Sequence, residues 1–252
     1  MTANRKMQHR SSVLREMGLA PLWKLRKPQE LQLSAQHQPD NTKNESAQNE
    51  ASSIDDHRTA AIAQMSWQEL RASVAECRAC ALCQERKQAV WGVGDESADW
   101  LFVGEGPGAE EDARGEPFVG QAGKLLDAML RAIGLQRGSN VYITNAVKCR
   151  SPGNSNNTPK PEEIAACRPY LERQIALLQP RLIVALGRPA AQSLLQKELK
   201  IVAARGQLHT AFDVPVIVSY HPAYLLRTPT DKALAWEDLC LARRTMQGSE
   251  TQ

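Results

Sequence analysis

The sequence lacks any long apolar run and carries little net charge. No stretch approaches the roughly 20 apolar residues that a membrane-spanning helix needs, and the polar N-terminus has no signal-peptide core. We therefore expect a cytoplasmic protein that binds no membrane. The formal net charge is +3, which permits nucleic-acid binding without arguing for it, because a local basic face matters more than the sum.

The glycine-rich segment at residues 104–108 lacks the signatures of a phosphate-binding loop. Its spacing does not match the dinucleotide fingerprint, and no Lys-Ser/Thr pair follows it as a P-loop requires. The acidic residues Glu105 and Glu111 would in addition repel a phosphate. Carboxylates beside a glycine loop suit reactions on water or on a developing cation. A solvated acidic turn is the alternative interpretation.

Composition divides the chain into unlike parts. Residues 34–58 are rich in Gln, Asn, Ser, Asp and Glu and hold almost no large apolar groups, so they cannot bury enough surface to order themselves. An island with apolar residues at helical spacing precedes them, and it suits either a docking peptide or an arm that folds back on its own domain. We predict a docking peptide at residues 1–30, a disordered linker at 31–62, a folded domain at 63–246 and a tail at 247–252.

Strand-like runs alternate with helical patterns in the folded domain. Ser66 and Glu69 form a capping-box pattern, which predicts a helix running towards Cys77. The apolar runs are typical of strands that are buried on both faces. Because strand and helix alternate, we expect an α/β fold with a parallel sheet and helices on both faces. The runs lie at residues 101–103, 141–144, 182–186 and 214–218.

Three of these predicted strands are followed by a polar residue. Glu105 follows the first strand, Asn145 ends the second, and His221 comes just after the last. Taken singly, such an Asn or His is more often structural than catalytic. The carboxyl ends of parallel strands meet at one edge of a sheet, where ligands bind in α/β folds, so their shared position favours a functional site.

Four of the six cysteines have the spacing of metal ligands. Two residues separate Cys77 from Cys80 on a tight turn, and Cys149 and Cys167 follow after a long gap. Four thiolates suit a structural zinc or an iron–sulfur cluster, and the spacing does not choose between them. A redox-active pair is the alternative, but the strand–CxxC–helix context of a thioredoxin is absent.

Several linked motifs resemble those of the family-4 uracil-DNA glycosylases. They are the segments at residues 104–112, 117–120, 142–150 and 221–227, and they occur together with the four spaced cysteines. The resemblance implies a three-layer α/β/α sandwich around a four-stranded, mainly parallel sheet. It also implies removal of uracil from single- or double-stranded DNA, which leaves an abasic site. The cofactor that it implies is a [4Fe–4S] cluster bound by Cys77, Cys80, Cys149 and Cys167.

The chemistry of the motif residues agrees with that activity. Phe118 would stack on a flipped-out base, and the Asn145 amide would accept a hydrogen bond from uracil N3–H and donate one to O4, whereas cytosine presents the reverse pattern. His221 would donate to uracil O2, and Gly106 would let the backbone close on the base. The carboxylates of Glu105 and Glu111 would orient water or stabilise the sugar cation, or Glu111 would exclude the methyl group of thymine.

The segment after His221 is expected to contact DNA. Leu225 resembles the apolar wedge that fills the gap left by a flipped nucleotide, with core packing as the alternative, and Arg227 would hold a phosphate. Two other function classes stay open at this point. They are a cluster- or zinc-bearing DNA-binding module without glycosylase activity, and a cysteine-based redox protein.

The N-terminal island at residues 10–28 resembles the N-terminal peptide of the psi subunit of the bacterial DNA polymerase III clamp loader. That resemblance implies docking on the clamp loader. Trp23 would be the anchor, since a large aromatic side chain seated in a pocket often dominates a small interface. The polar linker would then tether the enzyme near the replication machinery.

Overall fold

A computed structural model describes residues 56–151 and 158–248 of the chain. Its centre is a six-stranded sheet with the strand order β1-β3-β2-β4-β6-β5. The four inner strands, β3, β2, β4 and β6, run parallel to one another. At the two edges, β1 pairs antiparallel with β3, and β5 pairs antiparallel with β6. The strands are β1 (Val93–Gly94), β2 (Trp100–Gly104), β3 (Val141–Asn145), β4 (Leu182–Leu186), β5 (Leu208–Ala211) and β6 (Val214–Ser219).

The four parallel strands are those predicted from the apolar runs, and the expectation of four strands in all was wrong. Strand β1 has only two residues, which is too short to give an apolar pattern. Strand β5 exposes Leu208 and Thr210 and buries Ala211, so it lacks the continuous apolar run of an inner strand. Edge strands with one exposed face are weaker signals in a sequence than buried ones.

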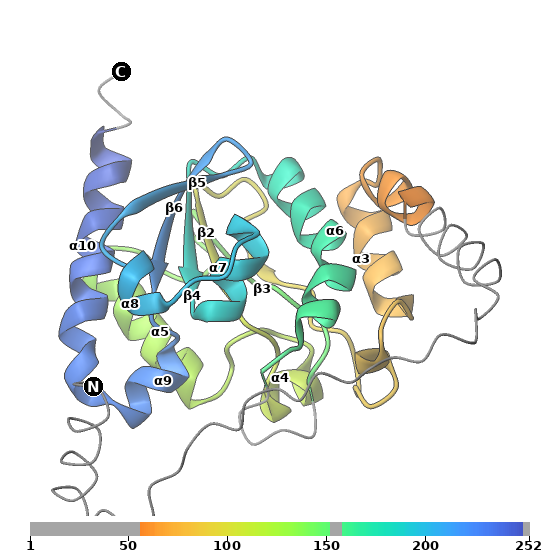
Figure 1. Cartoon of the computed structure of the whole chain (residues 1–252), viewed down its shortest axis with the longest axis horizontal. Helices are drawn as coiled ribbons and strands as arrows, with labels where there is room; N and C mark the ends of the chain where they lie inside the picture. Colours follow the sequence, from red (N-terminus) through yellow and green to blue (C-terminus); the bar gives the residue numbers. More distant parts are fainter. Residues whose placement is uncertain (1–55, 152–157, 249–252) are drawn as a thin grey trace, which may run out of the picture. The chain divides into compact units, whose positions relative to one another are not determined.

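Helices cover both faces of the sheet and form a three-layer α/β/α sandwich. Figure 1 shows α5, α9 and α10 on one side and α6 with α3 on the other. The α-helices are α3 (Trp67–Glu76), α4 (Ala109–Arg114), α5 (Gln121–Ala132), α6 (Pro161–Leu178), α7 (Arg188–Leu195), α8 (Ile201–Ala204), α9 (Pro222–Arg227) and α10 (Lys232–Gly248). None of the described helices is long and apolar enough to cross a membrane.

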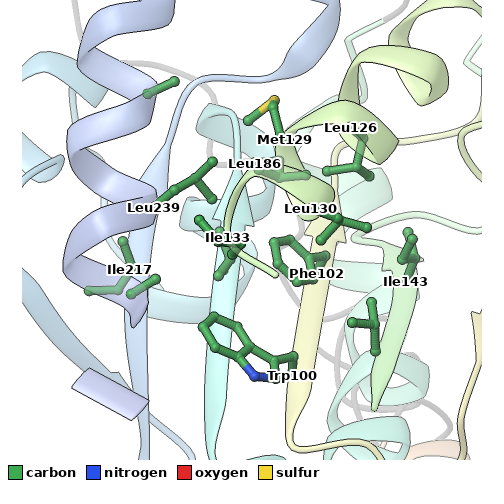
Figure 2. Packing of buried hydrophobic residues seen from close by; sticks show 14 of the residues in the cluster. Trp100, Phe102, Leu126, Met129, Leu130, Ile133, Ile143, Leu186, Ile217 and Leu239 are labelled. Atoms are coloured by element: carbon green, nitrogen blue, oxygen red, sulfur yellow. The ribbon is translucent and has the colours of Figure 1, made fainter. Parts of the chain in front are cut away.

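Alternate residues of each strand feed two separate cores. In β2, Phe102 packs with α5 and α10 in one cluster, whereas Leu101 and Val103 pack with α6 and α7 in the other. Figure 2 shows the first cluster, in which Leu130 of α5 and Leu239 of α10 meet the sheet. Both faces of the parallel strands are therefore buried, and their carboxyl ends are the part of the sheet left free to form a site.

Two local predictions meet different outcomes. Ser66 caps α3, with its side chain accepting from Glu69 N and Glu69 reaching back to Ser66 N, so the capping box is confirmed. Glu105 and Glu111 were assigned to a glycine loop or an acidic turn, but residues 109–114, which include Glu111, form helix α4. Acidic side chains in a first helical turn are stabilised by the helix dipole, which explains why this segment is helical despite its charge.

The docking-peptide predictions for residues 1–30 and 10–28 lie outside the described residues. The linker prediction for 31–62 was wrong at its end, because residues 56–62 are helical and Ile62 is 2% exposed. Arg58 Nη2 donates to Ala166 O at 2.8 Å, which ties this segment to α6. At the other end, α10 continues through Gly248 into the predicted tail, whose remaining residues are not described.

Candidate functional site

A cleft of about 370 Å³ lies at the carboxyl ends of the parallel strands. We call it the polar cleft. The loop after β2, the end of β3 and the start of α9 bring its functional side chains together, as expected from their common position along the strands. Among the residues that line it are the predicted Glu105, Gly106, Glu111, Phe118, Asn145, His221 and Arg227.

Close packing at two glycines sets the shape of the polar cleft. A Cβ at Gly104 would lie 2.6 Å from Cζ of Phe118, and one at Gly106 would lie 2.7 Å from Cγ2 of Val147. Real Cβ contacts are not this short, so a side chain at either position would displace the ring or the loop after β3. Both glycines are needed because the backbone passes directly beside its neighbours.

Glu105 is a partly buried carboxylic acid in the cleft. Burial raises its pKa to about 7, and the positive charges of Arg188 and Arg227 oppose that rise. The group therefore changes charge near neutral pH, which is unusual for a glutamate. A carboxylate with this pKa can act on a proton or a positive charge at physiological pH.

Glu111 serves the backbone of the neighbouring loop. Its Oε1 accepts from Val119 N at 3.1 Å and from Gly120 N at 3.3 Å. These two amides precede helix α5, whose N-cap residue is Gly120 and makes no side-chain cap. Glu111 therefore fixes the segment between Phe118 and the start of α5, while its side chain still lines the cleft.

Phe118 has a backbone conformation that a phenylalanine rarely adopts. Its φ is 56°, in the left-handed region, where a bulky non-glycine residue costs about 1–3 kcal/mol. Its ring is 6% exposed and lies against the His221 ring, with centroids 5.4 Å apart and planes 29° apart. The surrounding structure must hold this residue, because the relaxed conformation would take the ring elsewhere.

Asn145 ends β3 with a buried amide that faces the cleft. It is 2% exposed, and within the described part of the chain its Oδ1 has no hydrogen-bond partner. Its backbone is fixed, since Lys148 Nζ donates to Asn145 O at 2.7 Å and the next amide, Ala146 N, donates to Gly104 O at 2.8 Å. A buried polar atom without a partner costs free energy unless a ligand satisfies it.

His221 is the N-cap residue of α9. Its Nδ1 accepts from Ala223 N at 3.2 Å, so in the neutral ring the proton is on Nε2. Burial, together with a smaller contribution from the positive charge of Arg227, lowers the pKa of His221 to about 4. The ring is therefore neutral at physiological pH and offers one N–H donor.

Strand β6, which ends two residues before His221, is anchored to helix α10. Ser219 Oγ donates to Asp238 Oδ2 at 2.8 Å, and Asp238 also accepts from Arg205 Nε at 3.2 Å. Asp238 is 0% exposed and lies on α10, so this network joins the end of β6 to the helix layer. It fixes the end of β6, two residues before His221.

Helix α9 places its leucines differently from the prediction. Leu225 is 1% exposed and belongs to the core cluster, which favours the core-packing alternative over the wedge role. Leu226 is 43% exposed. It follows Ala223 by three residues, so it shares the helix face of a residue that lines the cleft. Arg227 is exposed and lines the cleft as well.

The four predicted ligand cysteines line a second, small cavity, which we call the cysteine cavity. Its lining also contains Cys83, which is not one of the four spaced cysteines. The cavity adjoins the segment after β3, since Cys149 lies four residues beyond Asn145. All six cysteines are free, so no disulfide competes for the thiols. The ligand cysteines in the cavity lining are Cys77, Cys80, Cys149 and Cys167.

Two basic residues donate hydrogen bonds to the sulfurs of the cysteine cavity. Arg86 Nη1 donates to Cys149 Sγ at 2.9 Å, and Lys148 N donates to Cys167 Sγ at 3.3 Å. Arg86 Nη2 also donates to Ala75 O at 2.6 Å, at the end of α3. Such donors stabilise thiolates that bind a metal or a cluster.

Burial keeps the thiols of Cys149 and Cys167 protonated when no metal is bound. It raises the pKa of Cys167 to about 12 and raises the pKa of Cys149 as well, although Arg86 opposes the rise at Cys149. Across residues 56–151 and 158–248, no set of three or more His, Cys, Asp or Glu side chains is arranged to hold a single metal ion.

Several residues of the two sites escaped the sequence reasoning. Tyr224 lines the polar cleft, and its ring stacks on Tyr220 with centroids 5.0 Å apart. Lys148 is 1% exposed although lysine is normally at the surface. Its position between the apolar Val147 and Cys149, directly after a buried strand, was the available signal. Arg86 had no signal, because its partner lies 63 residues away.

Comparison with known proteins gives concordant matches. The family model described as the uracil DNA glycosylase superfamily matches residues 91–241. A Type-4 uracil-DNA glycosylase of Pyrobaculum aerophilum is 40% identical over 185 residues, which cover 70% of this chain and 93% of that protein. The Archaeoglobus fulgidus enzyme of the same name is 46% identical over 164 residues, 62% and 81% of the two chains. The Thermotoga maritima one is 45% identical over 161 residues, 63% and 82%.

Proposed function

This chain belongs to the uracil-DNA glycosylase superfamily, and we propose that its polar cleft binds a uracil flipped out of DNA and hydrolyses the N-glycosidic bond. The product is an abasic site in the DNA together with free uracil. Bases inside a duplex are out of reach of a catalytic pocket, so an enzyme of this kind acts on an extruded nucleotide. The protein is therefore a DNA repair enzyme.

The unpartnered Oδ1 of Asn145 is the observation that carries this proposal. It accepts the N3–H of uracil, and the amide nitrogen donates to O4. Cytosine has an acceptor at N3 and a donor at C4, so it would leave the buried amide without partners. Phe118 gives the base a stacking surface, and the glycine at 106 lets the backbone approach it.

Bond cleavage leaves negative charge on the departing uracil and positive character on the sugar. His221 donates its Nε2–H to uracil O2, where the negative charge develops, because its Nδ1 is engaged by Ala223 N. Ionised Glu105 stabilises the sugar cation and holds the attacking water. We assign this role to Glu105 rather than to Glu111, because Glu111 already accepts from two backbone amides.

A base-excision assay tests this function directly. An oligonucleotide with one uracil, incubated with the protein and then treated with alkali, should break at that position. The same oligonucleotide with cytosine or thymine there should stay intact, and Asn145→Asp should weaken the discrimination against cytosine. Intact uracil-containing strands after incubation with native protein would contradict the proposal.

We further propose that Cys77, Cys80, Cys149 and Cys167 bind a [4Fe–4S] cluster. Four cysteines around one cavity and two N–H···S donors support that group. The cluster would supply a rigid link between the segments that carry these residues. Arg86 and Lys148 would orient the sulfurs from two sides. Iron analysis and a visible absorption spectrum of the purified protein test this, and one zinc without iron would contradict it.

Arg227 and Leu226 are proposed to contact the DNA around the flipped nucleotide. Arg227 binds a backbone phosphate, and its charge also acts on Glu105 and His221. Leu226 takes the wedge role first given to Leu225, because it is the exposed leucine of α9.

Docking of residues 10–28 on the clamp loader stays a proposal from sequence alone. Deletion of residues 1–30 should abolish binding to purified clamp loader and leave activity on oligonucleotides unchanged.

A further inference from the structure

Phe118 is held in its strained conformation by contacts outside the polar cleft. Its left-handed φ of 56° is unfavourable for a phenylalanine, and its carbonyl oxygen accepts from Arg137 Nη2 at 2.9 Å. Arg137 Nη1 donates to the carbonyl of the preceding residue, Pro117, at 3.0 Å. The two arms of one guanidinium thus fix two successive peptide groups, which a single-point cation cannot do.

Arg137 itself stands on a rigid support. It occupies a tight turn in which Ser139 N donates to Gln136 O at 3.1 Å and Gly138 has a φ of +79°. Its Nε donates to Asp127 Oδ1 at 2.9 Å, on helix α5, and its side chain is 20% exposed. The guanidinium therefore keeps one orientation, with each of its three nitrogens engaged.

We propose that Arg137 is a positioning residue for uracil excision, which acts by locking Phe118 in the conformation that presents its ring to the base. The inference rests on the proposed function of the polar cleft. Arg137 does not appear in the described lining of that cleft, so it does not touch the substrate. It works with Glu111, which accepts hydrogen bonds from the backbone amides of the two residues that follow Phe118.

Removal of the guanidinium should release the strain at Phe118. The backbone would relax to a negative φ, and the ring would leave its place beside His221. The base then loses its stacking surface, while the DNA-contacting residues of α9 keep their positions. Excision should therefore slow more than DNA binding weakens.

A double-mutant cycle tests this route of action. Single-turnover excision of uracil from a single-stranded oligonucleotide is measured at saturating enzyme for native protein, Arg137→Met, Phe118→Gly and the double variant. Arg137→Met should be roughly 10- to 100-fold slower than native. Glycine adopts the left-handed conformation without strain and has no ring to place. In the Phe118→Gly background, Arg137→Met should therefore change the rate less than about twofold.

Arg173→Met is the matched control. Arg173 Nε donates to Met65 O at 2.6 Å on the opposite helix layer, so its loss removes a similar arginine–carbonyl bond away from the cleft. This variant should lower stability and keep the excision rate. Arg137→Lys retains the charge but only one donor group, so its rate should fall between those of native protein and Arg137→Met. Affinity for uracil-free DNA should change little in any Arg137 variant.

The outcomes separate this inference from the proposed function. If native protein removes no uracil, the proposed function fails. If native protein is active and Arg137→Met excises uracil equally fast, the positioning role is wrong. It is also wrong if Arg137→Met lowers the excision rate by the same factor in the native and the Phe118→Gly backgrounds. Urea denaturation shows whether Arg137→Met folds. If this variant does not fold, the double-mutant cycle is run with Arg137→Lys instead, and the same rate comparisons test the positioning role.

Discussion

The polar cleft and the cysteine cavity flank one segment of chain, residues 145–149, and they are built on opposite principles. In the polar cleft, hydrogen bonds from within the protein hold two of the functional residues: Ala223 N donates to the His221 ring, and Lys148 Nζ donates to the Asn145 backbone. In the cysteine cavity, burial raises the pKa of Cys149 and Cys167, so the thiols stay protonated without a metal. The folded chain therefore positions the side chains of the first site by itself, whereas in the second site the proposed cluster would have to displace the thiol protons.

Lys148 joins the two sites. Its side chain donates to Asn145 O at 2.7 Å and to Thr144 Oγ1 at 2.8 Å, and its backbone N donates to Cys167 Sγ at 3.3 Å. A displacement of the cysteine sulfurs should therefore also move Asn145, whose amide is proposed to bind the base. A disturbance at the base-contacting side chains should leave the sulfurs in place, because those side chains are not their supports. The comparison thus predicts an asymmetry between the two sites.

The largest effect is expected from loss of a cysteine ligand. Cys77→Ser should abolish iron binding and visible colour, and it should lower the free energy of unfolding by about 4 kcal/mol or more, as loss of a structural metal site does. Asn145→Asp is the matched variant in the polar cleft and should retain iron. The measurements are iron content, absorption and urea denaturation. Equal iron loss in both variants would break the asymmetry.

Loss of the donor to uracil O2 should give the next largest effect. His221→Ala removes the neutral Nε2–H and should slow single-turnover excision roughly 10²- to 10³-fold, with iron content unchanged. His209→Ala is the control, because His209 is a partly buried histidine on edge strand β5 whose Nε2 contacts Ala204 O at 2.8 Å. A near-native rate for His221→Ala at saturating enzyme would remove the assigned role.

Glu105 should make the excision rate depend on pH near neutrality. Its pKa of about 7 means that the ionised form is lost below that pH, so the rate should fall up to about tenfold per pH unit there. His221, with a pKa of about 4, stays neutral over the same range. Glu105→Gln should be slower than native and independent of pH between 6 and 8. Persistence of the acidic limb in Glu105→Gln would assign it to another group.

The same two groups affect stability with opposite signs. Between its normal pKa of 4.5 and about 7, folded Glu105 keeps a proton that the unfolded chain releases, so its contribution to stability falls as pH rises. His221 is neutral in the folded state between about 4 and its normal 6.5, where the unfolded chain binds a proton, so its contribution rises with pH. The two slopes oppose each other from 4.5 to 6.5. A stability profile of Glu105→Gln should therefore slope upward in this window.

The sequence predicts the residues whose role follows from a strand end or a motif. The four inner strands are visible as apolar runs, and Glu105, Asn145 and His221 follow from the rule that parallel strands end at one edge. The supports of these residues depend on distant partners. Arg137 reaches Phe118 O from 19 residues away and Arg86 reaches Cys149 from 63, and no local pattern encodes such a pairing. The burial of Leu225 likewise depends on how α9 rests on α5.

The smallest effect is expected at the rim of the polar cleft, where the two leucines of α9 can be compared directly. Leu226→Ala removes an exposed apolar side chain worth about 1 kcal/mol of contact, so excision from duplex DNA should slow roughly five- to tenfold. Excision from single-stranded DNA should not change, because no base stack has to be opened there. Stability should be native.

Leu225→Ala should give the opposite pattern. Leu225 is 1% exposed in the core, and a buried leucine cut back to alanine typically costs about 2–5 kcal/mol of stability. Its effect on excision should be the same for both substrates, since a loosened α9 misplaces His221 whatever the DNA. The ratio of duplex to single-strand rates therefore identifies the wedge. A change of that ratio in Leu225→Ala, with none in Leu226→Ala, would return the role to Leu225.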